Sequence, residues 1–205
     1  MKKLILLTTC ILLIGTYAKG QAFEKGKNYF SVGIGTGNFS QAFIRAAVEG
    51  SAENVKFIGT GPLFVKYERG VEEKIGFGIN IAYMSNAVNY QETNTDSVPY
   101  NYDAKLKCTT FSVLARVNFH LGDHEKLDPY IGIGLGYRSV NWSYTDNDRN
   151  SNTNAADLGF DAFPSFPLGA DLTFGLRYLF TQNIGLYSEV GMAKGVIQGG
   201  LQFKF

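Results

Sequence analysis

The stretch PYIGIGLGYR, from Pro129 to Arg138, shows most clearly how the chain is built. Large residues alternate in it with the smallest one, in the order Ile131, Gly132, Ile133, Gly134, Leu135, Gly136 and Tyr137. A period of two residues is that of a β-strand, whose successive side chains point to opposite faces. The stretch therefore predicts a strand with one bulky apolar face and one narrow face of glycine.

Seven further segments show a similar alternation, so the sequence predicts eight strands. They are NYFSVGIGTG, PLFVKYE, IGFGINIAY, FSVLARVNFHL, LGADLTFGLRYLF, IGLYSEVGM and the closing VIQGGLQFKF. Short connections follow the second, fourth and sixth segments, and long polar ones follow the first, third and fifth, at roughly 38–61, 86–105 and 145–165. We expect an antiparallel up-and-down sheet with short turns at one rim and long loops at the other.

Two closed eight-stranded barrels fit this pattern, a soluble lipocalin-like barrel and a transmembrane barrel, and they differ in which face points inward. The bulky face would overfill so narrow a lumen, whereas glycine on the inner face leaves room for long polar side chains. A Lys or Arg that faces lipid costs about 2–4 kcal/mol at the bilayer midplane. The pattern therefore favours an all-β transmembrane barrel with its charges inside. The predicted lumen charge network comprises Lys66, Glu68, Arg116, Arg138, Asp171, Arg177 and Glu189.

The N-terminus predicts a separate segment. A basic head at 1–3 precedes the apolar run LILLTTCILLI at 4–14, and small residues follow before Gln21. This layout is typical of a secretory signal peptide, and the apolar run is too short to span a bilayer. We expect a cleavable signal peptide over 1–20 and a barrel domain over 21–205.

The charge balance and the cysteine content limit the partners and the covalent cross-links that the barrel domain can have. Of 19 basic residues, three lie in the first twenty positions, which leaves 16 basic residues against 18 acidic ones in the barrel domain. No basic excess remains to attract nucleic acid, so we expect no nucleic-acid partner. Cys108 is the only cysteine of the barrel domain, which rules out a disulfide within it.

The signal peptide, the motif PYIGIGLGY and the terminal GLQFKF resemble those of the small outer-membrane β-barrel domain family that includes OmpX-like and opacity-type proteins. The resemblance covers about residues 25–205. It implies a porin-like barrel in the outer membrane of a Gram-negative envelope, with both mature termini in the periplasm. It also implies that the barrel-assembly machinery reads the last strand through Leu201, Phe203 and Phe205.

One loop matches part of a calcium-binding pattern. Asp146, Asp148, Asn150 and Asp157 occupy positions 1, 3, 5 and 12 of that pattern, but Ser151 stands where the sharp turn needs glycine. We therefore expect a solvated loop and no metal site.

Neither a cofactor nor catalysis is expected. The glycines keep a period of two inside strands, unlike those of a dinucleotide-binding turn. The only histidines, His120 and His124, are predicted near the periplasmic end, where no Ser–His–acid set converges.

The predicted function is therefore structural or interactive. The barrel would stabilise the envelope and display its long loops for adhesion or for an extracellular partner, with the lipid bilayer around it. A narrow channel for small solutes is the alternative. An enzyme that modifies lipids of the outer leaflet is the third possibility.

Overall fold

The structure, a computed structural model, describes residues 21–37, 53–94, 99–148 and 167–205. The predicted signal peptide lies outside these ranges. The described residues form eight strands: β1 (Asn28–Thr36), β2 (Glu53–Glu72), β3 (Ile75–Asn94), β4 (Tyr100–His120), β5 (Leu127–Asp146), β6 (Leu168–Leu179), β7 (Ile184–Met192) and β8 (Ile197–Lys204). In the same ranges, no helix is long and apolar enough to cross a membrane.

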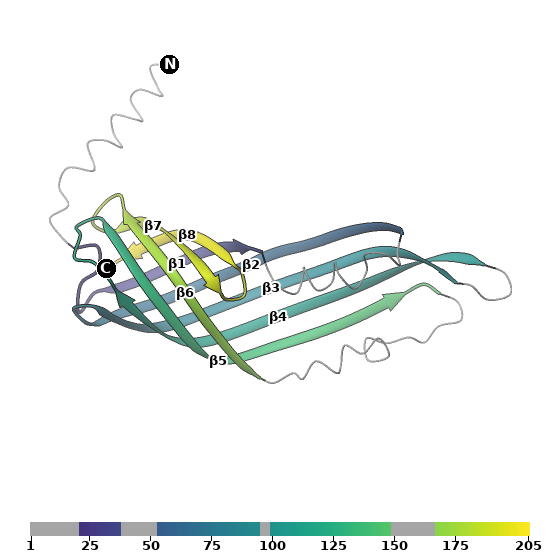
Figure 1. Cartoon of the computed structure of the whole chain (residues 1–205), viewed down its shortest axis with the longest axis horizontal. Helices are drawn as coiled ribbons and strands as arrows, with labels where there is room; N and C mark the ends of the chain where they lie inside the picture. Colours follow the sequence, from purple (N-terminus) through teal and green to yellow (C-terminus); the bar gives the residue numbers. More distant parts are fainter. Residues whose placement is uncertain (1–20, 38–52, 95–98, 149–166) are drawn as a thin grey trace, which may run out of the picture.

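Each strand pairs antiparallel with the next, and β8 closes the barrel against β1 (Figure 1). Val32 lies opposite Leu201 across this seam, and the backbones of Asn28 and Phe205 exchange hydrogen bonds of 2.8 and 2.9 Å. Closure pairs the backbone of the last strand as well as that of the first, so the sheet has no open edge at the level of β1 and β8. The predicted eight-stranded antiparallel barrel is confirmed.

The two faces of the wall are strongly different. Phe77, Ile133 and Phe174 point outward and keep about half of their surface exposed, at 51%, 49% and 50%. Arg116 and Arg177 point inward and are only 4% and 3% exposed. The bulky apolar face is therefore the outer one, as the alternation predicts, and the charged side chains lie around the barrel axis.

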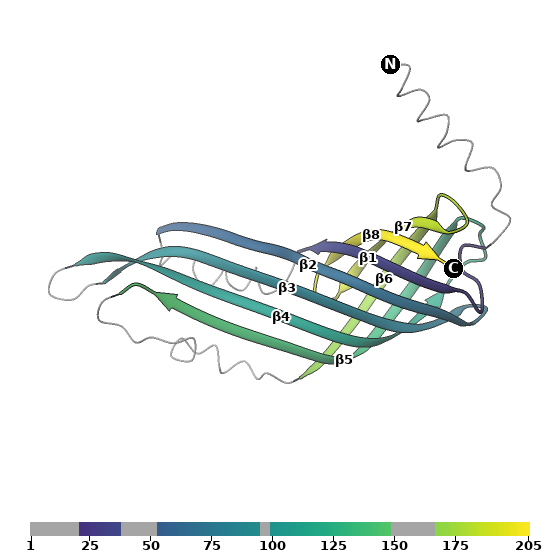
Figure 2. The same ribbon diagram turned by 180° about the vertical axis from the view of Figure 1, so that it is seen from behind.

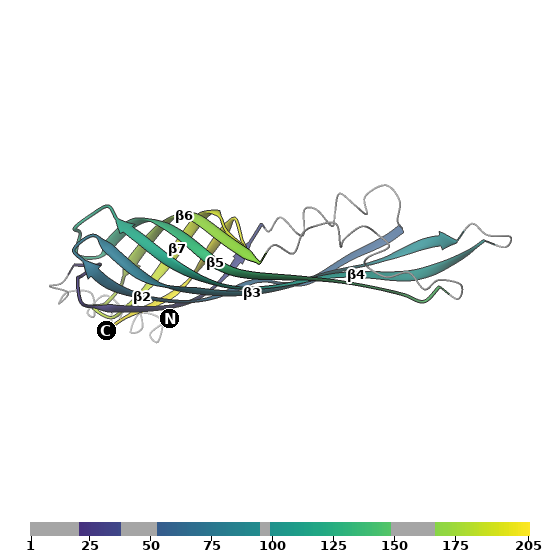
Figure 3. The ribbon, with the colours of Figure 1, turned by 90° about the horizontal axis from the view of Figure 1, so that it is seen from below.

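Four strands continue far beyond the barrel wall. β2 to β5 are 20 or 21 residues long, whereas β1, β7 and β8 have eight or nine. Their extensions form a curved sheet that projects from one end of the barrel (Figures 1 and 3). We call this sheet the arm: residues 53–60, 85–94, 100–109 and 139–146. Figure 2 shows the carboxyl terminus at the opposite end, which we call the turn side because the β2–β3, β4–β5 and β6–β7 turns lie there.

The prediction of a long loop at 86–105 is wrong for most of its length. β3 and β4 pair without interruption from Ile75 opposite Phe119 to Asn94 opposite Tyr100. The reason is an apolar core on the inward face of the arm. Val88, Tyr90, Ala104, Leu106 and the free thiol of Cys108 are buried there, and Phe57, Val140 and Trp142 pack against them.

Polar contacts reinforce the arm beside this core. The hydroxyl of Tyr102 donates a hydrogen bond to Glu92 across the β3–β4 pair. This bond to a carboxylate, together with burial, raises the pKa of Tyr102 above its ordinary value. Thr93 donates to Asn101 at 2.9 Å one position further along.

Substituting Ile133 by lysine tests which part of the wall faces lipid. Ile133→Lys places a cation in the apolar belt and is expected to lower the free energy of unfolding by about 2–4 kcal/mol. Ser143→Lys lies on the same face of the same strand, in the arm, and is expected to change it by less than about 0.5 kcal/mol. Urea unfolding in phospholipid vesicles measures both. Equal effects would contradict an apolar belt that ends below Ser143 on β5.

Candidate functional site

The barrel interior holds buried charged side chains. Six of the seven predicted residues lie there, each at most 8% exposed: Lys66 and Glu68 on β2, Arg116 on β4, Asp171 and Arg177 on β6, and Glu189 on β7. β5 contributes glycines at the same level. A Cβ atom on Gly132 would lie 2.1 Å from Nη2 of Arg116, and one on Gly134 would lie 2.5 Å from Oδ1 of Asp171. Glycine thus makes the room that the long side chains occupy.

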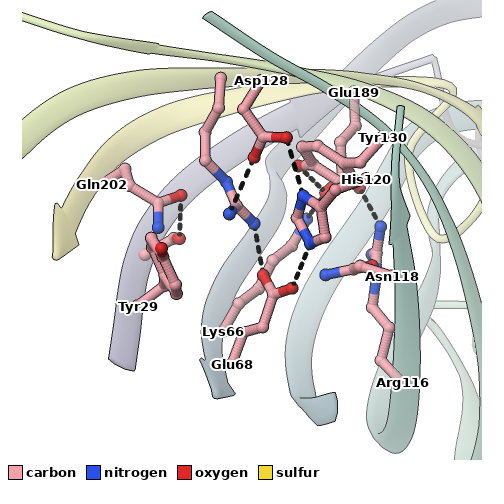
Figure 4. Close-up of polar contacts among 12 residues, drawn as sticks. Tyr29, Lys66, Glu68, Arg116, Asn118, His120, Asp128, Tyr130, Glu189 and Gln202 are labelled. Atoms are coloured by element: carbon pink, nitrogen blue, oxygen red, sulfur yellow. Dashed lines mark hydrogen bonds and ion pairs between the residues drawn. The ribbon is translucent and has the colours of Figure 1, made fainter. Parts of the chain in front are cut away.

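An arm-side cluster is centred on Glu189. Its carboxylate lies 2.8 Å from Nζ of Lys66 and 3.0 Å from Nη2 of Arg116, and it accepts a hydrogen bond of 2.6 Å from the hydroxyl of Tyr130 (Figure 4). Arg116 also lies 3.7 Å from Asp171. Amide and hydroxyl groups complete the cluster, since Gln198 donates to Glu189, Asn80 to Asp171, and Arg116 to Asn118 and Thr173.

A turn-side cluster forms a closed ring of four side chains. Glu68 lies 2.9 Å from Nε2 of His120, whose Nδ1 lies 2.7 Å from Asp128. Arg177 closes the ring through Asp128 at 3.2 Å and a hydrogen-bonded ion pair with Glu68. Figure 4 shows His120 between the two carboxylates. Both ring nitrogens can donate to these carboxylates when the imidazole carries two protons.

Each cluster balances its own charge. The arm-side cluster joins two cations to two carboxylates, and so does the turn-side cluster with a doubly protonated imidazole. Each of these buried charged groups lies within 3.7 Å of a group of opposite charge, which offsets part of the cost of burying it. The cavity that side chains of both clusters line has a volume of about 20 Å³. That is room for about one water molecule.

The segment just before β1, residues 21–27, covers the turn-side cluster. The ring of Phe23 stacks on that of His120 with a centroid distance of 3.4 Å and lies 5.4 Å from the ring of Tyr29. Glu24 forms an ion pair of 2.8 Å with Lys204 of the last strand. Residues before β1 therefore close the barrel at its turn side.

Among the titratable members of these clusters, the predicted network lacked three: His120, Asp128 and Tyr130. All three lie an even number of residues from a strand residue that the alternation places on the inward face. His120 lies four residues after Arg116 on β4. On β5, Asp128 and Tyr130 lie four and two residues before Gly132. Extending the period of two to the strand ends would have found them.

The structure corrects the prediction that Arg138 belongs to the lumen charge network. Arg138 has the inward parity, but it lies where β5 leaves the barrel for the arm, and its side chain is exposed. Lys194, another cation, lies near it. Burial and the positive charge of Arg138 lower the pKa of Lys194 to about 8. Lys194 in turn donates a hydrogen bond of 2.9 Å to the carbonyl of Ala82.

The other predicted sites are placed only in part. Leu201 and Phe205 lie exposed on the outside of the barrel and Phe203 is half-buried, and their contact with the assembly machinery stays a prediction. Of the calcium pattern, Asn150 and Asp157 lie outside the described residues. Within the described ranges, no group of three His, Cys, Asp or Glu side chains could hold a metal ion.

Removing Arg177 tests the turn-side cluster. Arg177→Met leaves the carboxylates of Glu68 and Asp128 buried with one cation fewer, and we expect it to cost about 3–5 kcal/mol of unfolding free energy. Lys74→Met, in an exposed ion pair with Asp123, is the control and is expected to cost less than about 1 kcal/mol. Both are measured by urea unfolding in vesicles, and similar values for the two would argue against a paired lumen.

Comparison with known proteins gives the family. The chain matches no curated protein. Among solved structures it is similar to the N-terminal β-barrel domain of Pseudomonas aeruginosa OprF, with 15% identity, a TM-score of 0.36, and coverage of 89% of this chain and 100% of that one. It is also similar to Ail, the attachment invasion locus protein of Yersinia pestis, solved with the heparin analogue sucrose octasulfate, with 13% identity, a TM-score of 0.36 and coverage of 88% and 99%. The sequence model of the outer membrane protein beta-barrel domain matches residues 6–205, and the chain therefore belongs to that family.

Proposed function

We propose that this outer-membrane barrel is a structural and interaction protein that displays its arm on the cell surface, where the arm binds an extracellular partner. The barrel anchors the arm in the bilayer, and the lumen network keeps the barrel rigid. Both mature termini face the periplasm in this proposal.

The length of the arm is the observation that carries the proposal. From Ser85 to Asn94, β3 stays paired with β4 for ten residues, which is roughly 30 Å at about 3.4 Å per residue. The polar layer of a phospholipid leaflet is only about 5–8 Å thick. A connection between two barrel strands needs no such length, so the arm is best explained by contacts made away from the bilayer.

The stiffness of the arm also favours binding. Its strands share a hydrogen-bonded ladder, and its inward face has an apolar core. A preorganised surface loses less conformational entropy on association than a mobile loop does.

The lumen supports a structural role for the barrel over the channel alternative. Ion pairs link side chains from different strands across the interior, as between Lys66 and Glu189 or between Arg177 and Glu68. A conducting path would have to separate such pairs. We also propose that the protein is not an enzyme, because His120 is held by two carboxylates and covered by Phe23.

The positions of Asn28 and Phe205 relative to the arm support the proposed orientation. The amino-terminal segment and Phe205 are joined at the turn side, where Phe205 pairs with Asn28. The arm lies at the other end (Figure 1). Barrels of this kind have short turns on the periplasmic side and longer connections on the outer side, so the proposal places the arm outside.

Shortening the arm tests the proposed function. Residues 87–107 are replaced by Asn-Gly, a two-residue hairpin turn that joins the opposed residues Asn86 and Cys108. The barrel is expected to fold, with a gel band that still shifts on boiling. Attachment of the producing cells to immobilised extracellular proteins and glycans is expected to fall to that of cells without the protein.

Surface labelling is the control for orientation. In a Cys108→Ala background, Asn101→Cys at the arm and Glu73→Cys in the β2–β3 turn are treated with a membrane-impermeant maleimide. Labelling of intact cells is expected at position 101 only, and at position 73 once the outer membrane is opened. Undiminished attachment by the shortened protein, or labelling in the reverse order, would contradict the proposal.

A further inference from the structure

The outward face of the arm carries lysines in two neighbouring rows. In one row Lys56 lies opposite Asn89, which lies opposite Lys105 and then Thr145. In the next row toward the barrel, Lys107 lies between Ala87 and Ser143, and the exposed Ile58 lies opposite Ala87. Adjacent strands are about 4.8 Å apart and alternate residues about 7 Å apart, so the three ammonium groups share one patch.

A recess lies over the first of these rows. Its volume is about 510 Å³, and its lining includes Lys56, Asn89, Gln91, Asp103, Lys105 and Thr145. The polar side chains at its far end are already ordered, because Gln91 accepts a hydrogen bond of 2.6 Å from Asn54 and donates one of 3.0 Å to Asp103. Amide, hydroxyl and ammonium groups therefore converge on a concave surface.

The patch carries charges of both signs, but its lysines are not engaged by other described residues. Two carboxylates line the recess, those of Asp103, which Gln91 engages, and of Asp146. No ion pair within the described ranges involves Lys56, Lys105 or Lys107. Elsewhere on the surface, exposed lysines do have partners, as Lys25 with Glu72 and Lys74 with Asp123. The arm lysines are left for an anion from outside the chain.

The height of the patch above the apolar belt indicates which kind of anionic headgroup can reach it. Phe111 is the last outward apolar residue of β4, and Lys107 and Lys105 follow it on the same face. At about 3.4 Å per residue and a tilt of about 40°, they lie roughly 10 and 16 Å above Phe111. The polar layer of a phospholipid leaflet, about 5–8 Å thick, ends below them. A headgroup built of several sugars with phosphate substituents reaches this height.

We propose that the recess and its three lysines bind the phosphorylated oligosaccharide headgroup of a glycolipid in the outer leaflet. The patch is continuous with the apolar belt below it, so a molecule that packs its acyl chains on the belt brings its headgroup to the lysines. The ammonium groups pair with phosphates, while Asn89, Ser143 and Thr145 offer hydrogen bonds to sugar hydroxyls. The inference rests on the proposed orientation of the arm, and it assigns one face of the arm to lipid.

A titration with purified full-length protein tests the site. Protein in detergent micelles is titrated with a rough lipopolysaccharide that has a phosphorylated core, with lipid A, which lacks the core, and with phosphatidylglycerol. Native mass spectrometry gives the apparent Kd. We expect the tightest binding for the core-bearing lipid, and an affinity that falls with salt.

The decisive variant is the triple substitution Lys56→Gln, Lys105→Gln and Lys107→Gln. A lysine near an anionic membrane surface strengthens association about fivefold, so the variant is expected to bind the core-bearing lipid on the order of 100-fold more weakly. The matched control, Lys25→Gln with Lys27→Gln and Lys74→Gln, changes three lysines at the turn side and is expected to bind like the wild type.

Three results would overturn the inference: equal binding by the triple variant and the control, equal binding of phosphatidylglycerol and the core-bearing lipid, or binding that persists when the core phosphates are removed. The titration does not depend on which side of the membrane the arm occupies in cells. Failure of the proposed function therefore appears in surface labelling and attachment, and failure of this inference appears in the titration.

Discussion

Hydrocarbon cannot donate or accept hydrogen bonds, and the architecture of this protein follows from that constraint. Every backbone N–H and C=O group at membrane depth must pair within the protein, which requires a closed sheet. Closure turns one face of each strand toward lipid and the other toward the axis, so the sequence must alternate between bulky apolar residues and glycine or polar ones. The seam between β1 and β8 completes the closure through the pairs that end at Asn28 and Phe205. Without that seam, two strand edges would be open to lipid.

The inward face has a second requirement, because eight strands leave little space for water. Six charged side chains of the predicted set, joined by His120 and Asp128, occupy that space as two ion-paired clusters. Breaking a buried pair exposes its partner to an environment that solvates it poorly, so each member depends on the others. Phe23 and the Glu24–Lys204 pair extend the packing to the turn side, where the two ends of the barrel domain meet.

The parts of the structure that could be read from the sequence are those governed by this alternation. Strand number, pairing and sidedness follow from it, and so does the placement of residues such as Arg116 and Glu189. Two kinds of feature did not follow. The arm alternates too, with Val88 and Tyr90 on its buried face, but polar residues such as Asn89 and Gln91 on the other face make the segment read as a loop. Arg138 lies on the inward face of β5 but beyond the barrel wall. The two-residue alternation predicts which face of the sheet a residue lies on, but not its position along the barrel axis. Pairing register, which gives the depth, is not visible in a single sequence.

Oxygen accessibility along β6 tests the central claim most directly. Nitroxide labels are placed one at a time at positions 171 to 176 in a Cys108→Ala background, and collision with dissolved oxygen is measured in phospholipid bilayers. Oxygen concentrates in hydrocarbon, so the account predicts maxima at Leu172, Phe174 and Leu176 and minima at Asp171, Thr173 and Gly175. Accessibility without a period of two, or with its maxima at the second set, would contradict a barrel with hydrocarbon outside and charge inside.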